Sequence, residues 1–175
     1  VHTFPKEQSP IWEKEKNITN PIAWYNFQIY NFYLLRRKYV WAFCSRKVGK
    51  STLLAVKNLH DLCGLKPKRL ICFAPTLGQD FVFDKMGKYL EKSPYLYETF
   101  IKNGGALTKE YINLSNGSEA QNRTIGLQNK GELIRGEYGD IVTIDEIQKI
   151  EESVMRQVVE PIIADAYSEK KFRVI

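Results

Sequence analysis

The sequence predicts an α/β fold in which a mostly parallel central sheet carries helices on both faces. Short apolar segments rich in β-forming residues alternate with longer segments whose apolar residues recur at helical spacing. The apolar segments at 39–44, 69–74 and 140–145 show no polar face, which is typical of strands buried on both sides. The alternation of such strands with helices favours parallel strands joined by helical crossovers.

The composition fits one globular domain. The chain has 175 residues, of which 43% are hydrophobic and 26% are charged. It lacks a run of about 18 apolar residues, so no membrane-spanning helix is expected. Three cysteines without C-x-x-C spacing and two histidines make zinc an unexpected ligand. The net charge of +6 permits a polyanionic partner, but a solvated basic surface gives the same balance.

The predicted elements follow one another in a regular order. Residues 1–20 are expected to form an irregular arm and residues 21–38 a buried helix. Strand 39–44 precedes a helix over 51–63 that ends at Gly64. Strand 69–74 ends at Pro75, and a helix over 78–91 follows. The remaining expected elements are a short helix starting near Pro94, a hairpin turning at Asn116-Gly117, strand 140–145, a helix over 151–160, a second helical piece after Pro161, and a strand at the end of the sequence.

The loop after the first strand indicates a phosphate site. The segment CSRKVGKST, residues 44–52, matches the second half of the pattern G-x-x-x-x-G-K-[ST], with Cys44 at the position of the first glycine. A strand, loop and helix in this order place backbone N–H groups and a helix N-terminus around a phosphate. Gly49 would allow close backbone approach, Lys50 would contact the β- and γ-phosphates, and Ser51 would offer its hydroxyl to Mg²⁺. The pattern predicts a P-loop NTPase; a plain strand-turn-helix with a surface lysine is the alternative.

An acidic pair follows the last buried strand before residue 150. The segment DIVTIDEIQ ends its apolar run at Asp145 and Glu146. The carboxyl ends of parallel strands meet at the edge where α/β sheets bind ligands, so this pair is expected near the loop. A nucleotide hydrolase uses one carboxylate to support Mg²⁺ and another to orient the attacking water. A helix N-cap is the alternative role for the pair.

Together these segments resemble the ATPase domain of the large terminase subunit, the motor that packages DNA into viral capsids. That family has a loop of the form S-R-x-x-G-K-[ST] without the first glycine, and SRKVGKS at 45–51 matches it. The similarity runs from about residue 20 to residue 175 and implies a P-loop NTPase fold of the ASCE type. Four further segments agree with the family in order and spacing, namely YNFQIY, FAPTLGQD, LSNGSEA and LIRGEYGDIVTIDEIQ.

The resemblance implies roles for individual residues. Glu146 would be the catalytic carboxylate, Arg46 would sense the γ-phosphate, and Asp145 would support the metal together with Ser51. Lys47 stands where the family often has glutamine, and Ile147 where a small residue is frequent, which bears on kinetics rather than on class. The implied catalytic residues are Glu146, Arg46 and Lys50, and the implied nucleotide-binding residues are Gln28, Ser45, Arg46, Lys47, Val48, Gly49, Lys50, Ser51 and Thr52.

Other residues are candidates with a structural alternative beside each. Gln28 would read the adenine edge, but a structural glutamine fits its aromatic surroundings nearly as well. Thr76 and Gln79 could couple nucleotide state to DNA, or could cap a helix and face solvent. The candidates for an arginine finger donated to a neighbouring subunit, each with an ordinary surface arginine as alternative, are Arg135 as the first choice, then Arg123 and Arg156.

The resemblance also implies a domain organisation and partners. Residues 1–20 would be an N-terminal arm and residues 21–175 the ATPase domain, leaving no room for the family's nuclease domain and no DNA cleavage by this fragment. The implied ligands are ATP and Mg²⁺, and the implied partners are double-stranded DNA, a portal and a small terminase subunit. The working motor is expected to be a ring, a pentamer by expectation, in the host cytoplasm, with the isolated domain a monomer. A helicase-like DNA-dependent ATPase and a nucleotide-gated DNA-binding module are the competing interpretations.

Overall fold

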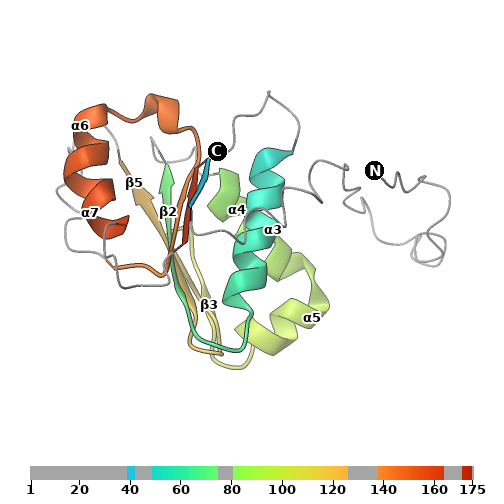
Figure 1. Ribbon diagram of the computed structural model, residues 1–175. Coiled ribbons are helices and arrows are strands. Elements are labelled where there is room, and N and C mark those ends of the chain that lie inside the picture. Colours follow the sequence, from blue (N-terminus) through green and yellow to red (C-terminus); the bar gives the residue numbers. More distant parts are fainter. Residues whose placement is uncertain (1–38, 42–48, 75–80, 126–137, 164–170, 175) are drawn as a thin grey trace, which may run out of the picture.

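A seven-stranded, mostly parallel sheet organises the described part of the protein (Figure 1). The structure is a computed structural model that describes residues 39–41, 49–74, 81–125, 138–163 and 171–174. The sheet has the order β1-β7-β6-β2-β5-β4-β3. Its strands are β1 (Tyr39–Trp41), β2 (Arg69–Ala74), β3 (Ala106–Leu107), β4 (Tyr111–Asn113), β5 (Glu119–Thr124), β6 (Ile141–Ile144) and β7 (Lys171–Val174).

The sheet has a parallel body and a short antiparallel extension. Each neighbouring pair from β1 through β7, β6 and β2 to β5 is parallel, whereas β5 pairs with β4 and β4 with β3 in antiparallel fashion. The last described strand, β7, lies between β1 and β6. The predicted mostly parallel α/β sheet is therefore confirmed, and the antiparallel strands add an edge to it.

Helices cover both faces of this sheet, as predicted (Figure 1). On one face lie α3 (Lys50–Leu62), α4 (Phe81–Lys92) and α5 (Pro94–Leu96), the last continuing into a π-helical turn, η1 (Tyr97–Ile101). On the other face lies the helical segment 152–163, made of α6 (Glu152–Val154), the π-helical turn η4 (Met155–Val159) and α7 (Glu160–Ile163). None of the helices among the described residues is long and apolar enough to cross a membrane.

The central strands β2 and β6 separate two apolar cores. Leu70 and Cys72 of β2 and Ile141 of β6 join a cluster with α3 and α4. Their sequence neighbours in the two strands face the segment 152–163, in a second cluster that includes Ile71, Phe73, Val142 and Ile144. Because side chains alternate across a strand, positions 143 and 145 continue the face of β6 that Ile141 turns toward α3.

Several element boundaries agree with the sequence pattern. The strand at 69–74 has the predicted bounds, and α3 begins one residue before the predicted start. Strands β4 and β5 form the predicted hairpin, with Asn113 opposite Glu119 and the turn around Asn116-Gly117. Strand β3 was not predicted, because two residues are too few to show an alternating pattern.

The predicted break at Pro161 is wrong. Helical structure runs without interruption from Glu152 to Ile163, and Pro161 lies in the first turn of α7. The π-helical turn η4 changes the hydrogen-bonding register just before Pro161, so the missing proline N–H does not end the helical segment. The predicted arm 1–20 and the predicted helix 21–38 lie outside the described residues, as do residues 42–44 of the predicted strand 39–44 and residues 78–80 of the predicted helix 78–91.

Candidate nucleotide site

The chain enters α3 through a glycine in the left-handed backbone conformation. Gly49 lies in the left-handed region, at φ 83° and ψ 21°, where a β-carbon costs about 1–2 kcal/mol. Its carbonyl already accepts a hydrogen bond from the Leu53 N–H at 3.0 Å, the first one of the helix. Glycine is therefore favoured at the point where the chain turns into α3. The backbone N–H groups of Lys50, Ser51 and Thr52, in the first turn, have no acceptor within the helix itself.

A hydrogen bond joins the start of α3 to the end of β6. Ser51 Oγ donates to Asp145 Oδ2 at 3.0 Å, across 94 residues of sequence. In Figure 1 the arrows of β2 and β5 point to the same end of the sheet at which α3 begins, and β6 runs parallel to β2. Two of the candidate residues are thus brought together at the carboxyl edge of the sheet, where α/β folds bind ligands.

Asp145 is a buried carboxylate, and one of its two oxygens could still accept a ligand. Only 3% of the residue is exposed, and Oδ1 has no hydrogen-bond partner among the described residues. Burial raises the pKa of this carboxyl, while the Ser51 hydroxyl and the positive charge of Lys50 act in the opposite direction. A buried carboxylate oxygen without a partner is costly, which favours a cation as its partner in the working protein.

The oxygen atoms present fit Mg²⁺. Magnesium is usually held by one or two carboxylates together with phosphate oxygens and water, rather than by a full protein cage. Ser51 Oγ and the two oxygens of Asp145 are hard ligands of this kind. No cluster of three or more His, Cys, Asp or Glu side chains that could hold a metal occurs in the described ranges.

Glu146 has an unusual backbone conformation. It lies in the left-handed region at φ 58° and ψ 48°, and no other non-glycine residue of the described part has positive φ. Such a conformation costs on the order of 1–3 kcal/mol and occurs preferentially at functional sites. The turn leads directly into η3 (Ile147–Lys149), and the Glu146 carboxylate forms an ion pair with Lys149. The carboxylate is therefore placed just beyond β6, beside Asp145, in a paired and partly exposed position.

Eight of the predicted residues lie outside the described ranges. They are Gln28, Ser45, Arg46, Lys47, Val48, Thr76, Gln79 and Arg135. Gly49, Lys50, Ser51 and Thr52 are described and form the entry to α3, and Asp145 and Glu146 are described at the end of β6.

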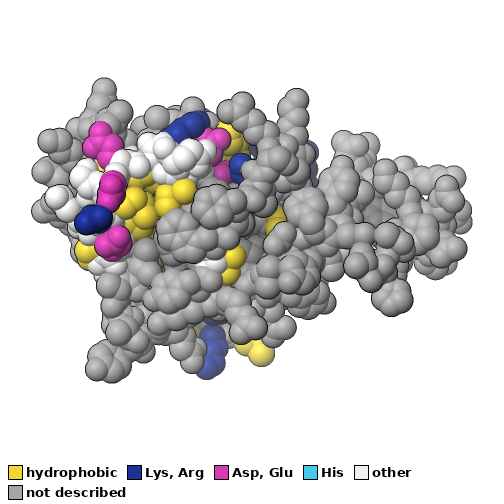
Figure 2. Space-filling model, turned by 45° about the horizontal axis from the view of Figure 1, so that its top comes forward, with side chains coloured by type: hydrophobic (Ala, Val, Ile, Leu, Met, Phe, Trp, Pro, Cys, Tyr) yellow, Lys and Arg dark blue, Asp and Glu magenta, His cyan; other side chains and the backbone are white. Residues whose placement is uncertain are grey.

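Two of the three arginine-finger candidates are described, and both have partners in the same chain. Arg123 on β5 donates to Tyr111 Oη at 3.1 Å and Gln121 Oε1 at 2.8 Å. Arg156 pairs with Glu152 on the exposed side of the segment 152–163. Figure 2, in which the top of Figure 1 comes forward, shows acidic and basic side chains gathered over this segment beside an apolar area. Arg156 is therefore part of an ordinary surface ion pair with Glu152.

Sequence reasoning missed a set of polar residues that are buried in α3. Lys57, Asn58 and Asp61 are at most 6% exposed, although residues of these types are mostly exposed in folded proteins. Lys57 Nζ and Asp61 form an ion pair, and Asn58 contacts Thr143 of β6. The spacing offered one usable signal: Asn58 is seven residues after Ser51, two helical turns along the same face.

Comparison with known proteins gives structural matches but no sequence match. No family model and no curated protein matches this chain. The ATPase domain of the large terminase from Thermus phage P74-26 superimposes with a TM-score of 0.60 at 20% identity, over 78% of this chain and 59% of that one. An arginine-to-alanine mutant of that domain gives 0.61 at 17% identity, with the same coverage. The large terminase of a thermophilic bacteriophage gives 0.52 at 14% identity, over 74% of this chain and 31% of that one.

These matches define the class of fold. The chain has the α/β fold seen in the ATPase domain of one phage large terminase, and it also superimposes on a second phage large terminase. It spans 59% of the first matched chain, so it resembles part of that protein rather than its whole length. The resemblance stated from the motifs and the resemblance in three dimensions therefore agree.

Proposed function

We propose that this chain is the ATPase motor domain of a large terminase subunit, and that it hydrolyses ATP to drive double-stranded DNA into a viral capsid. The observation that carries the proposal is the Ser51–Asp145 hydrogen bond, formed directly behind the left-handed Gly49. It unites the two motifs that the sequence analysis identified separately. The fold shared with phage terminase ATPase domains supports the same class.

Each described site residue has a proposed task. Lys50 places its positive charge at the β- and γ-phosphates, and the N–H groups of the first turn of α3 donate hydrogen bonds to phosphate oxygens. Ser51 and Asp145 would hold Mg²⁺, which neutralises charge on the phosphates when it is bound with ATP. The Glu146 carboxylate orients the attacking water and accepts its proton. Of the residues outside the described ranges, Arg46 is proposed to contact the γ-phosphate and Gln28 the adenine.

The motor proposal also assigns partners. Double-stranded DNA is the translocated substrate, and the portal and small terminase subunit are the proposed partners in the host cytoplasm. The isolated domain would be monomeric, with the working ring assembled on the portal. Thr76, Gln79 and Arg135 remain the proposed coupling and trans-acting residues.

Nucleotide binding by a Lys50→Ala variant tests the site. We expect the variant to lose measurable ATP binding, because the lysine supplies the cation at the β- and γ-phosphates. Isothermal titration calorimetry with Mg²⁺-ATP on folded protein measures this directly. Lys66→Ala is the matched control, since Lys66 is an exposed lysine in the turn after α3. Equal affinity in wild type and Lys50→Ala would contradict the assignment of the loop.

A further inference from the structure

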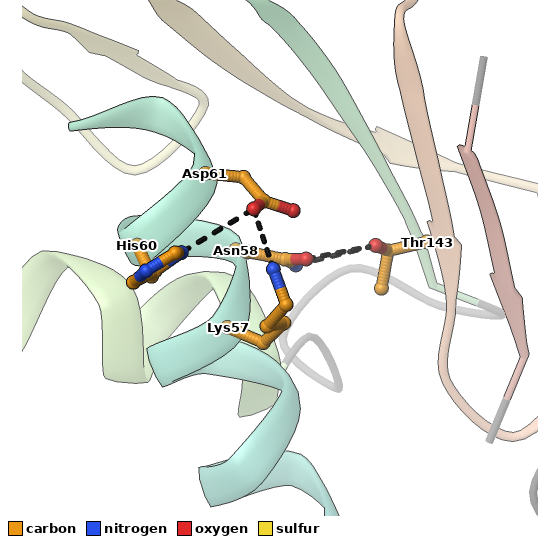
Figure 3. A network of polar contacts seen from close by, with 5 residues as sticks. All are labelled: Lys57, Asn58, His60, Asp61 and Thr143. Atoms are coloured by element: carbon orange, nitrogen blue, oxygen red, sulfur yellow. Dashed lines mark hydrogen bonds and ion pairs between the residues drawn. The ribbon is translucent and has the colours of Figure 1, made fainter. Parts of the chain in front are cut away.

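A second polar contact joins α3 to β6, away from the candidate site (Figure 3). The side-chain amide of Asn58 faces the hydroxyl of Thr143, with Nδ2 to Oγ1 at 3.2 Å and Oγ1 to Oδ1 at 3.3 Å. Both residues are almost completely buried, at 0% and 1% exposure. Asn58 Nδ2 also lies 3.9 Å from the sulfur of Met86 on α4.

The two contacts between α3 and β6 belong to one geometric arrangement. Ser51 and Asn58 are seven residues apart, which places them two turns apart on the same face of α3. Thr143 and Asp145 are two residues apart, which places them on the same face of β6. The Ser51–Asp145 and Asn58–Thr143 contacts therefore connect the same two faces at two levels, about 10 Å apart along the helix.

A polar pair at this position is not required for packing alone. The surrounding core is mainly apolar, and the hydrogen bonds between the amide and the hydroxyl offset part of the cost of burying both groups. An apolar pair of similar size would fill the same space at little or no cost in stability. Apolar contacts, however, tolerate sliding of a helix along a sheet, whereas hydrogen bonds weaken steeply outside a narrow range of distance and angle.

We propose that Asn58 and Thr143 are positioning residues that fix the position of α3 along the direction of β6. By doing so they set the separation between Ser51 Oγ and the Asp145 carboxylate, and thereby the affinity of the site for the divalent cation of a Mg²⁺-nucleotide. This inference rests on the function proposed above and adds two residues to its machinery. In this proposal Asn58 and Thr143 do not bind the nucleotide themselves, and they act through the Ser51–Asp145 contact.

The test uses isosteric variants and a metal-binding readout. Thr143→Val removes the hydroxyl with little change of shape, and the double variant Asn58→Leu/Thr143→Val removes both polar groups. For each we would measure the dependence of ATP binding on Mg²⁺ concentration by calorimetry, and Mn²⁺ binding to the ATP complex by electron paramagnetic resonance. Urea unfolding of the same proteins reports stability.

The expected results separate positioning from stability. Thr143→Val loses stability, since the Asn58 amide is left without that partner, and the double variant regains most of it. Both variants nevertheless need about tenfold more Mg²⁺ or Mn²⁺, the usual effect of disturbing an outer-shell residue of a metal site. ATP affinity in the presence of a chelator stays unchanged. Thr143→Ser keeps the hydroxyl and retains the wild-type metal dependence.

Controls distinguish failure of this inference from failure of the proposed function. Ser118→Ala removes a buried hydroxyl that accepts a hydrogen bond from the Lys68 N–H, far along the chain from the site, and should change stability without changing the metal dependence. A double variant with recovered stability and wild-type metal dependence would overturn the positioning role. Wild-type protein that binds no Mg²⁺-ATP would instead overturn the proposed function, and this inference with it.

Discussion

At the scale of the single residue, Glu146 combines a proposed catalytic role with a backbone conformation that lowers stability. Its left-handed backbone is unfavourable for any residue with a β-carbon, and its carboxylate is held by Lys149. The pair is partly exposed, at 48% for the lysine and 29% for the glutamate side chain, so it offsets little of that cost. A residue kept in an unfavourable conformation beside the candidate site is consistent with selection for chemistry rather than for stability.

Two substitutions of Glu146 should therefore both slow hydrolysis but should differ in their effect on stability. Glu146→Gln keeps the backbone cost and should slow hydrolysis by about 10²–10⁴ with ATP binding intact, the usual contribution of a positioned general base. Glu146→Gly should be equally inactive but no less stable than wild type, because glycine adopts this conformation without penalty. Single-turnover hydrolysis and urea unfolding measure the two effects. The proposed backbone cost is refuted if Glu146→Gly unfolds more easily than Glu146→Gln. Glu152→Gln is the control, because Glu152 is an exposed acid on α6.

Asp145→Asn should weaken metal binding while keeping or raising the stability of the metal-free protein. Burial raises the pKa of Asp145, so the folded protein disfavours the ionised form, and the carboxyl reduces stability as the pH rises from its ordinary pKa through the raised one. At neutral pH without Mg²⁺, we expect the variant to be as stable as wild type or more so, by about 0.5–2 kcal/mol. The advantage should fade at acid pH, where the wild-type carboxyl is protonated in both states. Meanwhile ATP binding should lose most of its dependence on Mg²⁺.

Denaturation at several pH values, combined with calorimetric titration of ATP with and without Mg²⁺, checks both parts. A variant that is less stable than wild type at neutral pH would mean that Ser51 and Lys50 more than compensate for the burial of the charge. Unchanged Mg²⁺ dependence would remove Asp145 from the proposed metal site.

At the scale of the element, the β4–β5 hairpin holds the far end of α3. Asn116 Nδ2 donates to the carbonyl oxygens of Leu62 at 2.8 Å and Gly64 at 3.1 Å. Its Oδ1 accepts a hydrogen bond from the Ser118 N–H at 3.0 Å, and Gly117 makes the turn at φ 84°. The last carbonyls of a helix lack partners within the helix, so this side chain completes the C-terminus of α3. The N-G-S motif therefore has a defined structural role in addition to its turn.

Asn116→Ala should lower the free energy of unfolding by about 1–3 kcal/mol, since it leaves partly buried carbonyl oxygens without these donors. Chemical denaturation measures the change. Asn103→Ala is the matched control, because Asn103 also donates to a carbonyl, that of Glu98 at 2.9 Å, but on the exposed surface. The control should stay within about 0.5 kcal/mol of wild type. Equal effects of the two substitutions would show that the contact with α3 is unimportant.

At the scale of the whole molecule, the candidate site lies where a helix layer meets the sheet. Its described residues come from the start of α3 and the end of β6, two elements on either side of a core interface. Because β6 lies beside both β2 and β7, a ligand held at this point is linked to the centre of the sheet. Binding there should therefore stabilise the cooperative unit rather than one loop.

Mg²⁺-ATP should raise the melting temperature of the domain. A ligand at about 100 times its Kd stabilises the folded state by about 2.7 kcal/mol, and each 1 kcal/mol corresponds to about 2–4 °C for a domain of this size. We expect a shift of about 5–11 °C with Mg²⁺-ATP. The shift should be much smaller with ATP and a chelator, and absent in Lys50→Ala. Differential scanning calorimetry at two nucleotide concentrations gives the measurement; a shift that does not grow with concentration would argue against specific binding.

The sequence by itself determined the features that depend on neighbouring residues. The apolar run of β2, the turn at Asn116-Gly117 and the glycine, lysine and serine at the start of α3 could all be predicted, because turn chemistry and side-chain periodicity are local. The tertiary structure decided what joins distant parts of the chain: the Ser51–Asp145 contact across 94 residues, the insertion of β7 between β1 and β6, and the burial of Asn58 against Thr143. It also decided the left-handed turn at Glu146 and the helix that continues through Pro161, where packing and hydrogen-bond register override local preference. Residue spacing sets which face of an element a side chain occupies, but only the packed fold sets which other element meets that face.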